Sequence, residues 1–173
     1  MNQMRAPLQI LALPYKIVDG NPVFCVFHRS DFNQWQFIAG GGEDDETPLQ
    51  AAKREILEES GVVAENIIEL KSLCYIPTDN FPQRASYGWP EDTYVIPEYC
   101  FAFECNDEIT LSHEHTEYAW LSYEKSRSKL KWDSNKVALY ELKCILNSKK
   151  ITDSIKRSHV LISTWLFLFF GKI

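Results

Sequence analysis

Three glutamates near the middle of the chain are the side chains best placed to do chemistry. They lie at positions 55, 58 and 59 of the segment Arg54–Gly61, which reads REILEESG. If this segment is a helix, residues three and four apart share one face, so that Glu55, Glu58 and Glu59 stand side by side. Like charges at this spacing repel one another. A divalent cation removes that conflict, and clustered carboxylate oxygens favour Mg²⁺, with Mn²⁺ as the alternative.

The residues on either side of the glutamates carry the signals of helix ends. Thr47 is predicted to be the N-cap, Pro48 occupies the favoured first helical position, and Gln50 completes a capping box. Gly61 is predicted to end the helix in the left-handed conformation. An apolar stripe beside the acidic face is formed by Leu49, Ala52 and Ile56. The helix is therefore expected to pack on a core while it presents its carboxylates to a cleft.

A glycine-rich segment, Gly40–Gly42, precedes the helix and leads into the acidic run Glu43–Glu46. We expect a loop in which the glycines adopt positive φ angles and let the backbone approach a ligand closely. Glu43, Asp44 and Asp45 are interpreted as solvated loop charges. The alternative for the whole stretch is a solvated acidic helix after a flexible loop. The glycines and both helix caps, at fixed offsets from the glutamates, favour a binding site.

This pattern resembles the complete Nudix box. Gly40 is followed after five residues by Glu46 and, after seven more, by Arg54-Glu55-Ile56-x-Glu58-Glu59-x-Gly61-Val62. The resemblance implies a Nudix hydrolase, a family that uses Mg²⁺ to cleave a nucleoside diphosphate linked to another group. It also implies the Nudix fold. That fold is an α+β (α/β/α) sandwich with a mixed, curved sheet between helices and a catalytic loop–helix–loop.

The rest of the chain is expected to supply the sheet and two further helices. Apolar and alternating runs predict strands at Leu8–Tyr15, Val23–His28, Gln34–Ala39, Ile67–Tyr75, Tyr99–Glu104 and shortly after Glu114. The turn signal Asp19–Pro22 makes the first two strands a hairpin. Helices are predicted to start at Ser122 and to span Asn135–Asn147, the second with Val137, Leu139, Leu142 and Ile145 on or near its buried side.

Length and composition limit the domain organisation. The 173 residues suffice for one domain. We expect a Nudix hydrolase domain over residues 1–147 and an apolar tail over residues 148–173. The run Val160–Phe170 is too short for an ordinary transmembrane helix. It packs on the domain, forms a homodimer or lies on a membrane surface. The first two are favoured, and no transmembrane segment is expected.

Charge and cysteine usage narrow the partners and the compartment. A net charge of −6 argues against nucleic acid as a partner, because nucleic-acid binding needs a basic surface, but it allows a small-molecule nucleotide or pterin triphosphate bound with metal. The five cysteines form no CxxC pair and suit free thiols in a reducing cytosol. The N-terminus lacks the long apolar core of a signal peptide. The predicted location is therefore cytoplasmic.

Three segments outside the box resemble the dihydroneopterin triphosphate pyrophosphatase branch, which is close to the dATP pyrophosphohydrolases. They are His28–Asp31 followed by Trp35-Gln36, then Glu114-His115-x-x-Tyr118-x-Trp120-Leu121, and Trp132-x-Ser134-Asn135-Lys136. His28 stands where the branch has an arginine. The resemblance implies that the substrate is contacted at Arg5, Arg29, Ala39 and Ser134.

Roles for the acidic residues follow from the resemblance and from metal chemistry. Glu55 and Glu59 are expected to bind metal directly, with Glu58 as a ligand or a helper. A fourth carboxylate is expected from Glu114, with Glu117 as the runner-up. The main-chain carbonyl of Ala39 or Gly40 is expected to add a ligand. Glu55, Glu58 or Glu114 accepts the proton of the attacking water.

Two other positions complete the expected site. Arg54 is interpreted as lying off the acidic face, in a salt bridge to Glu46 that holds the loop against the helix. His115 is interpreted as a structural histidine.

The long segment Ile76–Pro97 contains Arg84, Tyr87 and Trp89. These residues either recognise a ring or a phosphate or belong to a surface flap without ligand contacts.

The predicted reaction is attack of water on an inner phosphorus of a nucleoside or pterin triphosphate, with release of pyrophosphate and a monophosphate. Dihydroneopterin triphosphate and (d)NTPs are the leading substrates. The alternatives are a dinucleoside polyphosphate, ADP-ribose or an oxidised nucleotide as substrate. A nucleotide sensor without catalysis, and a structural protein that assembles through the tail, are weaker alternatives.

Overall fold

A mixed seven-stranded sheet organised around its first strand supports the rest of the molecule. The computed structural model describes the backbone of residues 4–170 and the side chains of residues 4–152. The strands are β1 Arg5–Val18, β2 Asn21–Arg29, β3 Trp35–Gln36, β4 Ile38–Glu43, β5 Ile68–Pro77, β6 Val95–Glu104 and β7 His115–Leu121. Their order is β3-β2-β1-β6-β5, with β4 paired to β1 and β7 to β2. The β1–β6 pair is parallel, and the other pairs are antiparallel.

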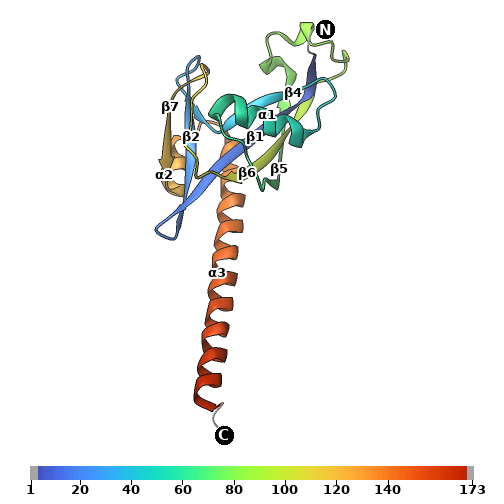
Figure 1. Ribbon diagram of the computed structural model, residues 1–173. Coiled ribbons are helices and arrows are strands. Elements are labelled where there is room, and N and C mark those ends of the chain that lie inside the picture. Colours follow the sequence, from blue (N-terminus) through green and yellow to red (C-terminus); the bar gives the residue numbers. More distant parts are fainter. Residues whose placement is uncertain (1–3, 171–173) are drawn as a thin grey trace.

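Helices cover both faces of this sheet, as the α/β/α sandwich requires. They are α1 Pro48–Ser60, α2 Tyr123–Lys129 and α3 Asp133–Phe170. The side chains of β1 alternate between two cores because successive residues of a strand point to opposite faces. Ile10 belongs to the core that contains Ile56 of α1, whereas Leu11 belongs to the core that contains Leu139 of α3. Figure 1 shows α1 lying over β4 and β1.

Both predicted ends of α1 are confirmed. The side chain of Thr47 accepts a hydrogen bond from the backbone of Gln50, and the side chain of Gln50 accepts one from the backbone of Thr47, so the capping box is complete. Gly61 ends the helix at φ +70°. The expected apolar stripe is wrong at Leu49, which is 42% exposed, whereas Ala51 is fully buried. Leu49 lies in the first turn of the helix, next to Pro48.

The hairpin is confirmed, and the later helices differ from the expectation in extent. Asp19 and Gly20 form the turn with φ of +50° and +74°, the conformation that two-residue hairpin turns require. The last helix is α3, which starts at Asp133 and does not stop at Asn147. Val137 is exposed, and Ala138 is buried in its place. The side chains of the apolar run Val160–Phe170 lie outside the described residues.

The single strand expected at Gln34–Ala39 is wrong, because the chain forms two strands there. β3 and β4 are separated at Phe37, whose backbone N–H donates to the side chain of Asn135 in α3 at 2.9 Å. The glycine loop is also wrong. Gly40–Gly42 belong to β4, and the glycines described with positive φ are Gly20, Gly61 and Gly88.

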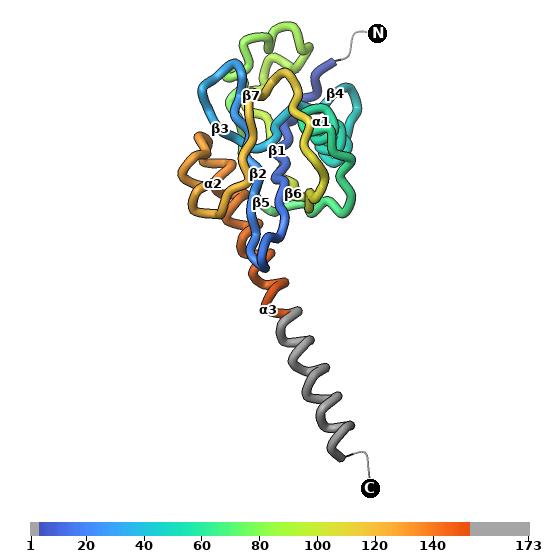
Figure 2. The backbone as a smooth tube through the Cα atoms, turned by 60° about the vertical axis from the view of Figure 1, so that its left-hand side comes forward, coloured from blue at the N-terminus to red at the C-terminus, as the bar shows by residue number. Residues whose placement is uncertain are grey.

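The segment between β5 and β6 folds over the start of β1. It contains the short 3₁₀ helices η1 Thr78–Asn80 and η2 Arg84–Ser86. Figure 2 shows this segment, drawn in light green, at the end of the molecule where β1 begins and near β4. The indole N–H of Trp89 donates to the carbonyl of Arg5 at 2.7 Å, and the ring of Trp89 packs edge-on against Phe81. The loop is therefore attached to β1.

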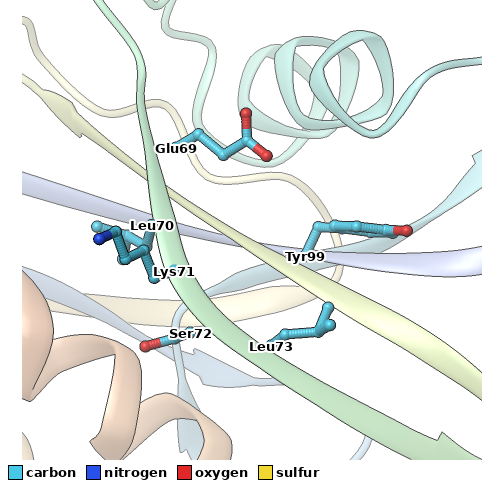
Figure 3. Close-up of a pocket in the computed structure, with 6 residues that line it drawn as sticks. All are labelled: Glu69, Leu70, Lys71, Ser72, Leu73 and Tyr99. Carbon is cyan, nitrogen blue, oxygen red and sulfur yellow. The ribbon is translucent and has the colours of Figure 1, made fainter.

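The pairing of β5 with β6 is interrupted by a bulge between Glu69 and Leu73. A hollow of about 470 Å³ opens beside it, lined by Glu69–Leu73 and Tyr99 (Figure 3). On the α3 side, the carboxylate of Glu141 accepts hydrogen bonds from the backbone N–H groups of Lys71 and Ser72, each at 2.7 Å. This carboxylate replaces the strand partner that the bulge removes.

Two observations bear on membrane association and redox state. Among the residues searched, no helix is both long and apolar enough to cross a membrane. All five cysteines are free thiols, and Cys25, Cys100 and Cys105 are buried. Burial raises the pKa of the Cys25 and Cys100 thiols, which keeps them protonated and unreactive.

We predict that Glu141→Gln destabilises the fold by about 1 to 2 kcal/mol at pH 7, because an amide cannot accept from both backbone N–H groups. Burial raises the pKa of Glu141, but hydrogen bonds from Ser72 and Lys71 outweigh it and leave the pKa below its ordinary value. The stabilisation is thus complete above the unfolded-state pKa of about 4.3 and is lost as the pH falls through the lower folded-state value.

Denaturant unfolding of wild type and variant at pH 7 and pH 3 measures this difference. Glu124→Gln is the control, because Glu124 makes only an exposed ion pair of 3.8 Å with Lys143 and should change stability little at either pH. A Glu141→Gln cost that stays the same at pH 3 contradicts the assignment.

Candidate active site

The three glutamates of α1 share one face but differ sharply in burial. The side chains of Glu55 and Glu59 are 12% and 3% exposed, whereas that of Glu58 is 55% exposed. The Oε2 atom of Glu59 is buried without a hydrogen-bond partner. The helix therefore directs two carboxylates towards the protein and one towards solvent.

The carboxylate of Glu55 occupies space that exists only because residue 40 is glycine. A Cβ atom on Gly40 would lie 1.9 Å from the carboxyl carbon of Glu55. A Cβ on Gly41 would lie 2.1 Å from the guanidinium carbon of Arg5. Because Gly40 and Gly41 point to opposite faces of β4, a carboxylate and a guanidinium each pack against the bare strand. The glycines are thus needed for space and not for an unusual φ.

Burial and mutual repulsion act together on these carboxylates. Burial raises the pKa of Glu55, Arg54 opposes this effect, and the charges of Glu58 and Glu114 reinforce it. Burial also raises the pKa of Glu59 well above its ordinary value. The negative charges of Glu55 and Glu114 push it in the same direction, whereas Arg29 and the backbone of Ala39 push it down. The cluster holds more negative charge than its surroundings compensate.

Arg54 lies among the acidic groups and not off their face, which corrects one expectation. Its guanidinium donates to Glu46 from Nε and Nη2, each at 3.0 Å, so the predicted salt bridge is present. It also donates to the carbonyl of Gly41 at 2.7 Å, to Glu55 at 2.9 Å and to Glu58 at 3.0 Å. Glu43 lies 3.2 Å away and is therefore not a free loop charge. Arg54 ties β4, the acidic turn and the helix together.

A second group of charges approaches Glu59 from β2 and β7. Arg29 pairs with Asp31 at 2.6 Å and lies 3.6 Å from Glu114. Glu114 acts electrostatically on both Glu55 and Glu59. Glu117 is exposed on β7 opposite His28 and is not among the charges that shift those two pKa values. The structure thus brings Glu114 to the cluster and leaves Glu117 outside it.

His115 forms the buried wall of this cluster. Its Nε2 atom lies 3.5 Å from the Oε2 atom of Glu59, and its ring packs 5.1 Å from that of Phe27. Burial, together with the positive charge of Arg29, lowers the pKa of His115 to about 4. The imidazole is therefore neutral at pH 7, which agrees with a structural role.

The donor set fits a hard divalent cation. Within the described side chains, no three His, Cys, Asp or Glu residues already surround one point. Glu55 pairs with Arg54, and Glu114 lies 3.6 Å from Arg29. The unpartnered oxygen of Glu59 needs a positive partner, and its repulsion with Glu55 and Glu114 decreases when a cation is present. Oxygen donors of this kind suit Mg²⁺ or Mn²⁺.

The expected substrate contacts lie in different places. Arg5 lines a hollow of about 220 Å³ whose other walls are Met4, Gly41, Gly42, Glu43, Glu55 and Tyr87. Its guanidinium lies 5.4 Å from the ring centre of Phe81 and 5.7 Å from that of Tyr87. Arg29 is beside Glu114, and the backbone of Ala39 faces Glu59. Ser134 is not part of this group, because its hydroxyl interacts with Glu98 of β6.

The loop before β6 contains a residue that stabilises the loop itself, Arg84, and a residue that lines the hollow, Tyr87. Arg84 donates to the carbonyls of Glu91 and Thr93 and so stabilises the loop itself. Tyr87 lines the hollow beside Arg5. Sequence reasoning missed Phe81, Gln9 and Glu98. A signal was available for Glu98, since it is the charged residue inside the run VIPEYCFAF of residues 95–103.

Known proteins resemble this chain in sequence and in fold. The NUDIX domain model matches residues 16–142. The RNA pyrophosphohydrolase of Sulfurovum sp. is 32% identical over 120 residues, covering 66% of this chain and 75% of its own. The dihydroneopterin triphosphate diphosphatase of Haemophilus influenzae is 32% identical over 124 residues, covering 70% and 78%. A crystal structure assigned to the NUDIX hydrolases from Listeria monocytogenes has 44% identity and a TM-score of 0.73, covering 84% and 97%.

We predict that Gly40→Ala lowers hydrolysis of a nucleoside triphosphate by about 100-fold, because the new methyl group displaces the carboxylate of Glu55 by an ångström or more. The matched control is Gly42→Ala, whose Cβ meets the flexible end of Leu8 at 2.8 Å, away from Glu55. It should cost about 1 to 3 kcal/mol of stability but retain activity per folded molecule. Equal losses of activity in the two variants would contradict the role assigned to the space above Gly40.

Proposed function

The chain belongs to the Nudix hydrolase family, and from this premise we propose that it is a Mg²⁺-dependent pyrophosphohydrolase of a nucleoside or pterin triphosphate. Its products are the monophosphate and pyrophosphate. Dihydroneopterin triphosphate and the (d)NTPs are the proposed substrates. The observation that carries the proposal is the buried, undercompensated carboxylate pair of Glu55 and Glu59 beside Arg5.

Glu55, Glu59 and Glu114 are the proposed metal ligands, joined by the carbonyl of Gly40. A divalent cation held by these groups would neutralise phosphate charge and lower the pKa of the attacking water. Glu58 is the proposed proton acceptor, because it is the glutamate of this face that is most open to water, and Arg54 holds it at 3.0 Å. Glu46 supports Arg54 from the other side. Arg54 thereby positions Glu58 relative to Glu55.

Two arginines, Arg5 and Arg29, are the main proposed contacts to the substrate phosphates. Arg5 lines a hollow together with Glu55, Arg29 lies beside Glu114, and guanidinium groups bind phosphate oxygens well. Each now pairs with a protein group, Arg5 with Gln9 and Arg29 with Asp31, which a phosphate can replace. The backbone of Ala39 and the hydroxyl of Ser134 are the remaining proposed contacts.

The net charge of −6 and the Haemophilus influenzae relative support a small triphosphate as the substrate. The free state of all five thiols supports a cytoplasmic location. We further propose that residues 1–147 form the catalytic domain and that residues 148–173 form a separate tail. We also propose that this tail can form a homodimer.

A second candidate function is removal of pyrophosphate from a triphosphate-ended RNA, which the Sulfurovum relative favours. The chemistry at phosphorus is the same in both cases. The acidic net charge favours the free small molecule, because an RNA chain needs additional basic contacts.

We predict that the protein with Mg²⁺ releases pyrophosphate and a monophosphate from dihydroneopterin triphosphate or a (d)NTP. Product analysis by anion-exchange chromatography checks this, with ADP-ribose, a dinucleoside polyphosphate, an oxidised nucleotide and triphosphate-ended RNA run in parallel. ADP-ribose would yield AMP and ribose phosphate without pyrophosphate. If no triphosphate in the panel yields pyrophosphate, the proposal is wrong.

We predict that Glu59→Gln lowers turnover by about 100-fold or more and weakens Mn²⁺ binding in calorimetry, because a neutral amide replaces a buried anionic ligand. Glu65→Gln, an exposed position shortly after α1, is the matched control and should behave as wild type. A nucleotide sensor would bind its ligand in both variants and turn over in neither. Full turnover by Glu59→Gln would remove Glu59 from the proposed ligand set.

A further inference from the structure

A row of polar and small residues crosses four strands on the face of the sheet that α3 covers. In register, Gly41 of β4 lies beside Gln9 of β1, Gln9 beside Glu98 of β6, and Glu98 beside Cys74 of β5. Two residues further along, Leu11 and Cys100 belong to the apolar core beneath α3. The row therefore marks the place where this core gives way to polar groups.

Glu98 is the unusual member of the row. It is 5% exposed, and its Oε1 atom has no hydrogen-bond partner among the described residues. Burial raises its pKa, whereas a hydrogen bond involving Ser134 at the start of α3 lowers it. A buried carboxyl oxygen without a partner costs stability and gives nothing to the fold in return. Such a cost is typical of residues kept for binding.

We propose that Glu98 determines which ring the enzyme accepts, because its carboxylate accepts hydrogen bonds from two adjacent N–H groups at the edge of the substrate ring. This inference rests on the proposed function, since it places the ring of the same triphosphate. A carboxylate offers two acceptor oxygens side by side. The 2-amino-4-oxo edge shared by guanine and pterin presents two neighbouring N–H donors. Adenine and cytosine present one donor beside a lone pair, which a carboxylate repels.

The row leads from Glu98 to the catalytic carboxylates. Gly41 lies two strand spacings from Glu98, roughly 10 Å, which is the scale of a nucleoside. β4, β1 and β6 run side by side in Figure 1. The carbonyl of Gly41 accepts from Arg54, and Gly40 holds Glu55 on the other face of the same strand. A ring at Glu98 thus places its phosphates near β4.

Arg5 connects the two ends of this path. Its guanidinium lies over Gly41 and donates to Gln9 at 2.5 Å, so it covers the end of the row that is formed by these two residues. Its Nε atom is buried without a partner. When the phosphates arrive, Arg5 exchanges Gln9 for phosphate oxygens, and the ring gains access to Gln9 and Glu98. The same arginine then binds the phosphates and uncovers the ring site.

Binding without hydrolysis tests the inference directly. Titration of GMP and AMP by calorimetry in EDTA should give at least tenfold tighter binding of GMP to the wild type. Glu98→Gln should abolish that preference, because the amide offers one donor and one acceptor. The matched control Glu104→Gln, at the exposed end of the same strand, should keep it. Equal loss of GMP and AMP binding in Glu98→Gln, or a wild-type preference for AMP, would overturn the proposal.

Hydrolysis separates this inference from the proposed function. Pyrophosphate release from GTP relative to ATP should fall at least tenfold in Glu98→Gln and stay unchanged in Glu104→Gln. A wild type that binds GMP through Glu98 but releases no pyrophosphate upholds the ring site and rejects the hydrolase activity. A wild type that releases pyrophosphate with a ratio insensitive to Glu98→Gln rejects the ring site alone.

A second variant distinguishes ring recognition from a role in the fold. Glu98→Met keeps the side-chain length and removes the carboxyl group, including its unpartnered Oε1 atom. It should unfold at the same temperature as the wild type or higher, while the GMP preference is lost. A clear fall in the unfolding temperature would mean that Glu98 stabilises the protein, and the proposal would then fail.

Discussion

The constraint on which the site depends is the burial of like charges against a strand that lacks side chains. Glu55 and Glu59 are both buried side chains of α1, and burial is the largest of the effects that raise the pKa of each. Gly40 provides the space for the first, and the neutral His115 forms the wall beside the second. A fold that merely needed stability would not bury two carboxylates next to each other. In the proposed function, a divalent cation and the phosphates of the substrate offset this repulsion.

The positive charge of Arg54 offsets part of the repulsion between these carboxylates. One guanidinium joins the acidic turn, the strand β4 and two of the helix carboxylates, through a side chain that is only 20% exposed. Its planar fork can serve several acceptors at once, which a lysine cannot do. The capped ends of α1 fix the helix at both ends, so the glutamates cannot avoid each other by fraying. The same contacts that hold the loop therefore also hold the reactive face.

The strand β4 separates two kinds of chemistry. On the α1 face it supports the carboxylates, and on the α3 face it borders the row that ends at Glu98. Arg5 belongs to β1 but reaches over β4, where the aromatic rings of Phe81 and Tyr87 hold it. A substrate with a charged chain and a flat ring has two ends of different chemistry. In the proposed binding mode, the bare glycines of β4 let both ends of such a substrate approach this strand closely.

The sequence by itself determined the local parts of this protein. The caps at Thr47 and Gly61, the turn at Asp19–Gly20 and the spacing of the three glutamates depend only on neighbouring residues, so they could be predicted. The ion pair between Arg54 and Glu46 was also predictable, because the box fixes both positions. The same holds for the fold class, because the box and the alternation of the strands agree.

The tertiary structure decided everything that depends on residues far apart in the chain. Phe37 leaves its strand because Asn135, 98 residues later, takes its N–H. The glycines proved to serve close packing, since the groups above them come from α1 and from the start of β1. The choice between Glu114 and Glu117 and the isolation of Glu98 depend on which strands meet. Neighbouring residues cannot encode these contacts, because burial and charge are properties of the assembled sheet.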